Sequence, residues 1–438
     1  MYRRMLALLI ILLLLVPAAQ AQTYRDIPDC LRIAQTSERT ILSASAYQLC
    51  YYPDTCQDAV DQELKTLIDD IALRLLPHVP AKAGNPQEKS YIDAGASIYR
   101  TGDSWASFLL SGCVVDNRKQ LAVEMDARAY DMATGKTLSL SDIVTPPAYD
   151  FLQQEAKAQL IAYFPQFDCD ASRLDALLSD MASVPFTFNT AFLSLHFRAD
   201  ALYDNQPTLM HVSVPFSALA SYLTEEAQKQ FDNSQYKMVA LTYDDGPART
   251  HTLAIARALR MGAANATFFI VGDRIPFGPE LIAFTHDTGF SVASHNYSHV
   301  FEYQARYKVQ EYRALMDDAV ARVIGRVPTV MRAPGGGEHV YIQENVNLPL
   351  IHWSLVARED LDQYIDPMRE ASRLSNTAKD GDIILMHDLR GITANIAQYI
   401  SAAFAEKNFL CVTVEELFAA RGLTLENNTV YYNAYPAK

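Results

Sequence analysis

The sequence predicts an α+β domain over residues 24–230, followed over residues 237–425 by an α/β domain whose strands form an incomplete β/α barrel. Two observations carry the second assignment. Short apolar runs alternate with segments of helical periodicity throughout the C-terminal half, which is typical of parallel β/α folds. Polar motifs follow the apolar runs, and residues after successive parallel strands meet at one end of such a barrel. We therefore expect an active site at that end.

Residues 24–230 combine helical and antiparallel patterns, which together indicate an α+β domain. Because this domain lacks a cluster of titratable residues at ligand spacing, a binding or spacer role is expected for it. A helix is predicted at Cys56–Leu76. A half-buried strand is predicted at Leu121–Tyr130, and a turn at Ala133–Lys136 leads from it into Thr137–Leu140, so that the two segments form a hairpin. Further strands are predicted at Ala191–Arg198 and Met210–Pro215, and a polar linker at Glu225–Lys237.

The C-terminal domain has seven predicted strands, fewer than the eight of a complete β/α barrel. The strands are expected at Lys237–Tyr243, Ala266–Val271, Phe290–Ser294, Val327–Arg332, Leu348–Ser354, Asp382–His387 and Phe409–Val414. The helices are expected at Thr250–Met261, Pro279–Thr288, Val309–Ile324, Pro367–Ala378, Ile392–Glu406 and Glu415–Arg421.

The N-terminus, Met1–Ala21, has the pattern of a secretory signal peptide. Two arginines precede an apolar run that ends at Val16, and Ala19-Gln20-Ala21 follows as the expected cleavage site. The run is shorter than the roughly 20 residues that a membrane-spanning helix needs. We therefore expect a secreted protein of the cell wall or periplasm without stable membrane insertion after cleavage; a retained signal anchor is the alternative.

The formal net charge of the chain is −14. A surface of this sign repels nucleic acid, so no nucleic-acid partner is expected, whereas a glycan of low charge is a compatible large substrate. Five of the six cysteines lie in the N-terminal half, and an oxidising compartment would favour disulfides among them. Cys50 and Cys56 are close enough in sequence to close a small loop, and Cys411 is expected to be a buried free thiol.

Two motifs in the C-terminal domain have the composition of a metal site. Asp244-Asp245-Gly246-Pro247 follows an apolar run; alone it could be an ordinary turn, but adjacent carboxylates could divide cation binding from proton transfer. His295 and His299 are four residues apart, which on one helical turn places both imidazoles on one face. An Asp-His-His set with open positions is what a catalytic zinc ion requires. The residues thus suggest a metal-dependent hydrolase.

Three further motifs complete the pattern. They are Arg332-Ala333-Pro334, the segment Trp353–Asp360, and Leu385-Met386-His387. The order and spacing of all five motifs resemble those of polysaccharide deacetylases of the NodB-homology type, carbohydrate esterase family four. The resemblance implies a distorted, seven-stranded, NodB-like barrel and a divalent metal, zinc, as cofactor.

The same resemblance implies a role for each motif residue. Asp244 would be the general base, and Asp245, His295 and His299 the metal ligands. Arg332 would orient the catalytic carboxylate, the backbone N–H of Gly335 would bind the oxyanion, and His387 would be the general acid. Glu359 and Asp360 both remain candidates for the acid that supports His387.

The chain departs from the family pattern at several positions. Asn296 follows the first histidine, where the family has Ser or Thr, and Gly335 follows Pro334, where the family has an aromatic residue. In the fourth motif Val356 replaces the first Asp. Read without a gap, Glu359 takes the position of the second Asp; a shift of one residue would give that position to Asp360.

The N-terminal half has a weaker resemblance of its own. Residues 131–142 are similar to part of an extracytoplasmic domain that precedes deacetylases in some cell-wall-modifying proteins. Together the resemblances imply a secreted deacetylase that removes N-acetyl groups from amino sugars of peptidoglycan, a cell-wall glycan. The alternatives are a deacetylase of chitooligosaccharides or of an exopolysaccharide, or a catalytically weak domain that only binds glycan.

Overall fold

The computed structural model describes residues 24–81, 90–300, 308–336, 340–359 and 365–436. The expected signal peptide lies outside these residues. Among the helices in the described part, none is long and apolar enough to cross a membrane.

The N-terminal half is built on a six-stranded sheet in the order β1-β2-β3-β4-β5-β6, antiparallel except for the β2–β3 pair. A second, antiparallel sheet has the order β7-β8-β9. The strands are β1 (Ala34–Ser43), β2 (Ala46–Asp54), β3 (Ser90–Thr101), β4 (Trp105–Asp116), β5 (Lys119–Asp131), β6 (Lys136–Thr137), β7 (Phe186–Phe188), β8 (Phe192–Arg198) and β9 (Leu209–Pro215).

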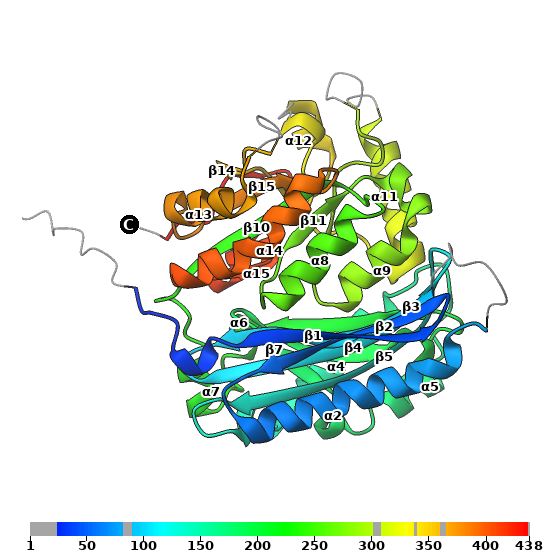
Figure 1. The fold of residues 1–438 in the computed structure, drawn as a ribbon, viewed down its shortest axis with the longest axis vertical. Helices are drawn as coiled ribbons and strands as arrows, with labels where there is room; N and C mark the ends of the chain where they lie inside the picture. Colours follow the sequence, from blue (N-terminus) through cyan, green and yellow to red (C-terminus); the bar gives the residue numbers. More distant parts are fainter. Residues whose placement is uncertain (1–23, 82–89, 301–307, 337–339, 360–364, 437–438) are drawn as a thin grey trace, which may run out of the picture.

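Helix α2 (Asp58–Leu75) connects the parallel strands β2 and β3 and covers the outer face of the larger sheet (Figure 1). Its apolar stripe includes Leu64, Ile68 and Ile71, all fully buried. Burying each such side chain contributes about 1.5–3 kcal/mol relative to exposure. The remaining helices of this half are α3 (Leu140–Ile143), α4 (Ala148–Ile161), α5 (Ala171–Leu177), α6 (Phe216–Leu219) and α7 (Glu225–Gln230). The predicted helix, hairpin and α+β character are thus confirmed.

Two expectations for the N-terminal half are wrong. The polar segment predicted as a linker contains α7, and Gln230 and Asn233 are buried because their side chains hydrogen-bond to residues 101–104. The structure also has all six cysteines as free thiols. Cys50 is buried within β2 and Cys56 is exposed between β2 and α2, and no disulfide joins them. Cys411, in the C-terminal half, is a free thiol as expected and is half-buried.

The C-terminal half contains a curled parallel sheet in the order β12-β11-β10-β15-β14, with β16 paired to the first residues of β10. Isolated bridges through Met331 connect it to a small β13–β17 pair. The strands are β10 (Lys237–Gly246), β11 (Thr267–Ile270), β12 (Ser291–Ser294), β13 (Leu350–Ile351), β14 (Leu355–Val356), β15 (Ile383–His387), β16 (Phe409–Val412) and β17 (Val430–Tyr431).

The curled sheet makes this half mixed α/β, as predicted, but it does not establish a seven-stranded barrel. The strand expected at Val327–Arg332 is reduced to a bridge at Met331, and the one expected at Leu348–Ser354 is shortened to Leu350–Ile351. The helices follow the predicted positions: α8 (His251–Met261), α9 (Pro279–Asp287), α11 (Val309–Ile324), α13 (Pro367–Thr377), α14 (Gly391–Glu406) and α15 (Val414–Ala420), with α12 (Val340–Asn345) in addition.

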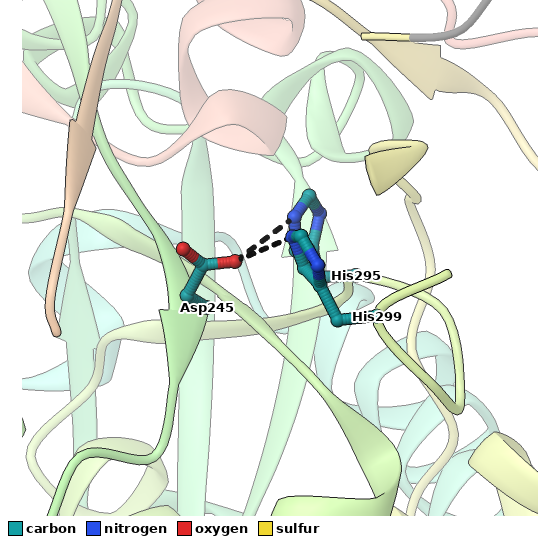
Figure 2. A group of neighbouring side chains, drawn as sticks. All are labelled: Asp245, His295 and His299. Atoms are coloured by element: carbon teal, nitrogen blue, oxygen red, sulfur yellow. Dashed lines mark ion pairs between the residues drawn. The ribbon is translucent and has the colours of Figure 1, made fainter. Parts of the chain in front are cut away.

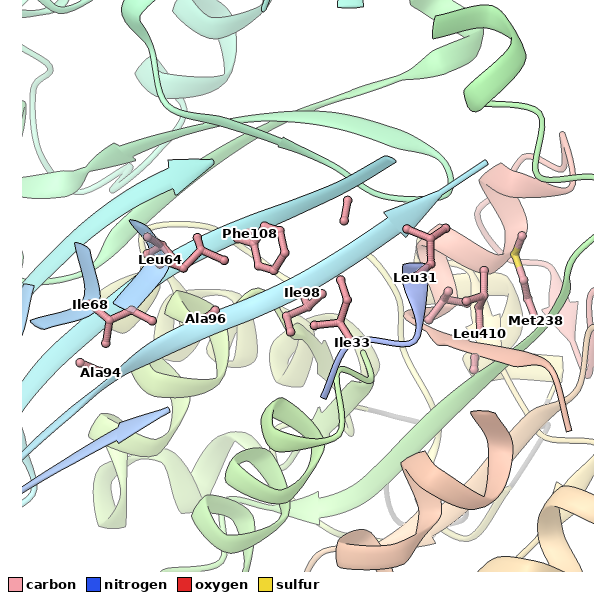
Figure 3. Packing of buried hydrophobic residues seen from close by; sticks show 14 of the residues in the cluster. Leu31, Ile33, Leu64, Ile68, Ala94, Ala96, Ile98, Phe108, Met238 and Leu410 are labelled. Carbon is pink, nitrogen blue, oxygen red and sulfur yellow. The ribbon is translucent and has the colours of Figure 1, made fainter. Parts of the chain in front are cut away.

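The two halves share one apolar cluster. It runs from α2 through β3 and β4 to Met238 on β10 and Leu410 on β16 (Figure 3). In Figure 1, α8 and α9 lie between the N-terminal sheet and the strands of the C-terminal half. The apolar contact is therefore continuous across the junction.

Buried charges also join the halves. Asp93 on β3 is fully buried and forms ion pairs with Arg257 Nε at 2.8 Å and Arg260 Nη1 at 3.3 Å, both on α8. On α9, Asp287 accepts hydrogen bonds from Thr208 Oγ1 at 2.6 Å and Gln120 Nε2 at 2.6 Å. Each of these acids is buried with its charge balanced or hydrogen-bonded, as buried carboxylates generally are.

Removing Asp93 should destabilise the whole protein. Asp93→Ala leaves the Arg260 guanidinium, which is 1% exposed, without its partner. Breaking a buried pair in this way typically costs about 3–5 kcal/mol. We expect a loss of that size in the free energy of unfolding, measured by urea denaturation. Lys157→Ala breaks the exposed pair with Asp175 and serves as control, with an expected change of less than about 1 kcal/mol. Equal effects of the two variants would contradict the structural role of Asp93.

Candidate active site

Most of the motif residues lie at the carboxyl ends of neighbouring parallel strands. Asp244 and Asp245 end β10, His295 follows β12, and His387 ends β15. In the register of β10 and β15, Asp244 lies beside His387. Strand β11 then connects β10 to β12 through parallel pairing. The sheet thus delivers these side chains to one edge, as predicted from the order of motifs.

Asp245, His295 and His299 form a compact cluster, in which both imidazoles face the same carboxylate (Figure 2). Asp245 Oδ1 is 2.9 Å from His299 Nε2 and 3.5 Å from His295 Nε2. One potential ligand atom from each residue lies within 4.8 Å of the others. These three residues are the candidate metal site.

The cluster has the donor set that a divalent cation requires. His295 Nδ1 is 2.9 Å from the carbonyl oxygen of Arg332, so Nδ1 carries the proton and Nε2 presents its lone pair to the cluster. Asp245 Oδ1 is buried and faces the Nε2 atoms of His295 and His299. Burial alone would raise the pKa of Asp245, but the nearby imidazoles of His295 and His299 outweigh it and lower that pKa to about 2. An ionised carboxylate and imidazole lone pairs suit a divalent transition metal.

The loop after β12 holds the two histidines in a way that the sequence did not indicate. The expected single helical turn is wrong: residues 295–299 form an irregular loop. Asn296, with φ of 66°, is in the left-handed region, which Asn tolerates better than most residues. This turn brings the rings of His295 and His299 to a centroid distance of 5.3 Å. The spacing of the pair was informative although the assumed local structure was not.

Asp244 is held by a fully buried arginine. Arg332 Nη1 donates to Asp244 Oδ1 at 2.7 Å and to Thr242 Oγ1 at 2.8 Å. Arg332 Nε donates to the carbonyl oxygen of Ile351 at 2.9 Å, and Nη2 to that of His352 at 3.0 Å. The guanidinium therefore has a fixed orientation, and it holds the second oxygen of Asp244, Oδ2, 3.9 Å from His295 Nε2.

His387 is supported by Glu359. Glu359 Oε1 accepts a hydrogen bond from the backbone N of His387 at 3.0 Å and lies 3.3 Å from His387 Nδ1. Its side chain is fully buried. Of the two acids that the sequence left open, Glu359 thus occupies the supporting position, as the ungapped alignment of the fourth motif indicated. Asp360 lies outside the described residues.

These groups surround a cavity of about 260 Å³. The side chains of Asp244, Asp245, His295, His299 and His387 all line it, together with Gly335, Gly336, Trp353, Leu385, Leu389 and Arg390. Arg332 contacts Asp244 and Glu359 contacts His387, each from behind the lining of the cavity. Every described residue proposed from the sequence is therefore in or directly behind one cavity.

Gly335 lines the cavity with a backbone conformation that restricts substitution. Its φ of 70° is in the left-handed region, where an added Cβ costs about 1–2 kcal/mol. Gly335→Ala should accordingly lower the free energy of unfolding by about that amount, whereas Gly335→Asn should lower it less. Denaturant unfolding measures both, with Gly391→Ala as control, since its Cβ would make ordinary contacts. A Gly335→Ala protein as stable as the control would refute this reading of the loop.

The sequence reasoning missed Asp388, which directly follows His387. Its side chain is fully buried and accepts a hydrogen bond from Thr252 Oγ1 at 2.5 Å. Burial raises the pKa of Asp388 to about 7, and the charges of Asp245 and Asp244 act in the same direction. Its backbone N donates to the carbonyl oxygen of Asp244 at 3.0 Å, so Asp388 couples the two strand ends. The sequence signal that could have indicated Asp388 is its position directly after the motif histidine, His387.

The chain is similar to several known proteins. Residues 232–348 match the polysaccharide deacetylase family. The chain is 31% identical over 42% of its length to the peptidoglycan-N-acetylglucosamine deacetylase PgdA of Listeria monocytogenes, and it spans 40% of that relative. It is 25% identical over 66% of its length to the peptidoglycan-N-acetylmuramic acid deacetylase PdaC of Bacillus subtilis, spanning 67% of it.

Two solved structures are also similar to part of the chain. A family 4 acetyl xylan esterase from Clostridium thermocellum, in complex with a cobalt ion, is 25% identical, with a TM-score of 0.43, over 46% of this chain and 100% of that one. Bacillus subtilis PdaC is 26% identical, with a TM-score of 0.41, over 43% and 94%. From the family match and the sequence relatives, the chain carries a polysaccharide deacetylase domain, preceded by an additional N-terminal region.

Proposed function

We propose that this protein is a metal-dependent deacetylase that hydrolyses N-acetyl groups of amino sugars in peptidoglycan. The observation that carries the proposal is the convergence of Asp245, His295 and His299 in one cavity with Asp244 and His387. A metal site, a proton acceptor and a proton donor are the parts that amide hydrolysis requires.

Asp245, His295 and His299 would hold the cation, for which zinc is proposed because its usual ligands are His nitrogen and carboxylate oxygen. Such a cation, when bound, polarises a carbonyl oxygen and lowers the pKa of a coordinated water. The three residues leave one side of the cluster facing the cavity, where a substrate carbonyl can approach.

Asp244 accepts the proton of the attacking water. Its Oδ1 is fixed by Arg332, so the other oxygen, Oδ2, remains for proton transfer on the side of His295. His387 donates a proton to the nitrogen of the departing sugar amine, and Glu359 stabilises the imidazolium form that makes this donation possible. The backbone N–H of Gly335, at the rim of the same cavity, is proposed to donate to the oxyanion.

The substrate and location are proposed from chemistry and relatedness. Relatives named as deacetylases of both N-acetylglucosamine and N-acetylmuramic acid residues of peptidoglycan support a cell-wall glycan as substrate. A chain of net charge −14 suits such a substrate better than nucleic acid. We also propose secretion to the cell wall or periplasm through the pattern at Met1–Ala21.

Metal removal tests the proposal directly. Purified peptidoglycan should release acetate with the wild-type protein, lose this activity after chelation, and regain it with added zinc. His299→Ala should lower both bound zinc and acetate release, whereas His78→Ala, a histidine outside the cavity, should change neither. Zinc is quantified by elemental analysis of the same samples. Metal binding without acetate release from peptidoglycan, chitooligosaccharides or exopolysaccharide would leave only the glycan-binding alternative.

A further inference from the structure

A second and larger cavity, of about 340 Å³, lies between the two halves of the protein. The C-terminal half contributes Asn265, which precedes β11, and Ser291, which begins β12. The N-terminal half contributes residues of β7, β8 and β9. The candidate metal ligands follow the opposite ends of these strands, so the two cavities lie at opposite ends of the same sheet.

A chain of hydrogen bonds fixes the protonation of two histidines in the wall of this cavity. His211 Nε2 is 3.1 Å from the carbonyl oxygen of His286, so Nε2 carries the proton and Nδ1 is an acceptor. His196 Nδ1 must then donate to His211 Nδ1, 2.8 Å away, and Thr187 Oγ1 donates to His196 Nε2 at 2.8 Å. Burial lowers the pKa of His196 to about 3, in agreement with a neutral pair. Both rings are thus fully engaged with protein groups.

His286 is different because one of its nitrogens has no partner. Its Nδ1 is 3.1 Å from Asp287 Oδ1, a carboxylate oxygen, so Nδ1 is the donor. Nε2 is then an acceptor, and it is buried without a hydrogen-bond partner among the described residues. The side chain is only 5% exposed and lines the cavity. Buried acceptors are rarely left unsatisfied, so this nitrogen indicates a missing donor.

Two charged residues complete the wall. Glu415 Oε1 accepts from Ser291 Oγ at 2.9 Å and Thr329 Oγ1 at 2.8 Å, but Oε2 is buried with no hydrogen-bond partner in the described structure. Arg326 lines the same cavity, and within the described residues no carboxylate lies close enough to form an ion pair with it. The wall therefore offers two unsatisfied acceptors and one uncompensated guanidinium.

We propose that this cavity binds a sugar acid, meaning a hydroxyl-rich ring that carries a carboxylate. His286 Nε2 and Glu415 Oε2 are buried in the cavity wall, so both side chains must turn toward the cavity before ring hydroxyls can donate to them. The carboxylate would pair with Arg326, whose planar fork suits that group. The volume lies at the lower end of the range of small-molecule sites, which suits a monosaccharide. The site is separate from the proposed hydrolytic cavity, and the inference does not rest on deacetylase activity.

D-glucuronate and D-glucose form a matched pair of probes, because they differ in a carboxylate against a hydroxymethyl group and neither has an acetamide to hydrolyse. Titration calorimetry with the full chain should give tighter binding of glucuronate than of glucose by about tenfold or more. The ring signals of His286 should shift on saturation in histidine-selective NMR. Equal affinities, no binding of glucuronate, or an unperturbed His286 would each overturn the proposal.

Variants locate the binding. Arg326→Gln should weaken glucuronate binding about tenfold and leave glucose unchanged, whereas Arg322→Gln, an exposed arginine on α11 paired with Asp318, should have no effect. Glucuronate binding should persist in His299→Ala, which lacks a proposed metal ligand of the other cavity. Loss of binding in His299→Ala would assign the ligand to the hydrolytic cavity and refute the second site. Loss of acetate release with intact glucuronate binding would concern the proposed hydrolysis alone.

Discussion

Asp244→Asn is expected to lower the rate of acetate release about 10²–10⁴-fold, the range that a positioned general base typically contributes. The amide of Asn retains an oxygen for the hydrogen bond from Arg332 Nη1 but is not basic enough to take a proton from water. None of the three proposed metal ligands is altered, so bound zinc should stay at the wild-type stoichiometry.

The same substitution removes the charge that balances Arg332. Because both side chains are buried, the protein should also lose stability, and breaking such a pair can cost about 3–5 kcal/mol. Activity must therefore be measured at a temperature where unfolding curves show the variant folded. Asp273→Asn, an exposed acid outside the cavity, is the control and should keep full activity. A folded, zinc-loaded Asp244→Asn enzyme with near-normal turnover would rule out Asp244 as the base.

The location of the site was predictable because its residues follow strands. Asp244, His295 and His387 each come after an apolar run, and parallel pairing through β11 and between β10 and β15 carries all three to one edge. Spacing within a motif was enough to pair the two histidines, even though the loop conformation around Asn296 was not foreseen. The periodicity of apolar residues does not predict a positive φ at a single residue, and such a φ shapes this loop.

The parts that failed depend on contacts between distant segments. Residues 225–237 are polar, which favours a linker. Gln230 and Asn233 are nevertheless buried, and they form hydrogen bonds with residues about 130 positions away. Apolar residues at Val327–Val330 satisfy a strand pattern, but the curled sheet leaves a bridge at Met331 alone. The contacts of Asp93, Asp287 and His286 are with residues of the other half of the chain, which a local sequence pattern does not reveal. Tertiary context overrides local pattern at all of these positions.

In the fourth motif the structure shows the contact of one of the two candidate acids, Glu359, with His387, while Asp360 lies outside the described residues. Two alignments gave the supporting acid as Glu359 or Asp360, and a single sequence offers no means of choosing a gap. In the structure Glu359 Oε1 contacts both the backbone N and the ring of His387. The longer side chain of Glu reaches the histidine from the loop after β14, so the loss of the family's first Asp at Val356 does not leave His387 without a carboxylate partner.

His387→Ala should therefore lower acetate release about 10²–10⁴-fold with zinc retained, because the imidazole is the proposed proton donor to the leaving amine. Glu359→Gln should have a smaller effect with a distinctive pH dependence. Removing the carboxylate charge makes the imidazolium form of His387 less stable, which lowers the pKa of that ring. Since the proposed acid must be protonated, the alkaline limb of the pH–rate profile should move to lower pH, by about one unit.

Glu370→Gln is the matched control, since Glu370 is a buried acid that pairs with Arg373 rather than with His387. It should leave the pH profile in place even if it lowers stability. A purely structural role for Glu359 would likewise reduce the amount of folded enzyme without moving the alkaline limb. An unchanged limb in folded, zinc-loaded Glu359→Gln would therefore show that this carboxylate does not tune the acid. Full activity of His387→Ala would require a different proton donor in the cavity.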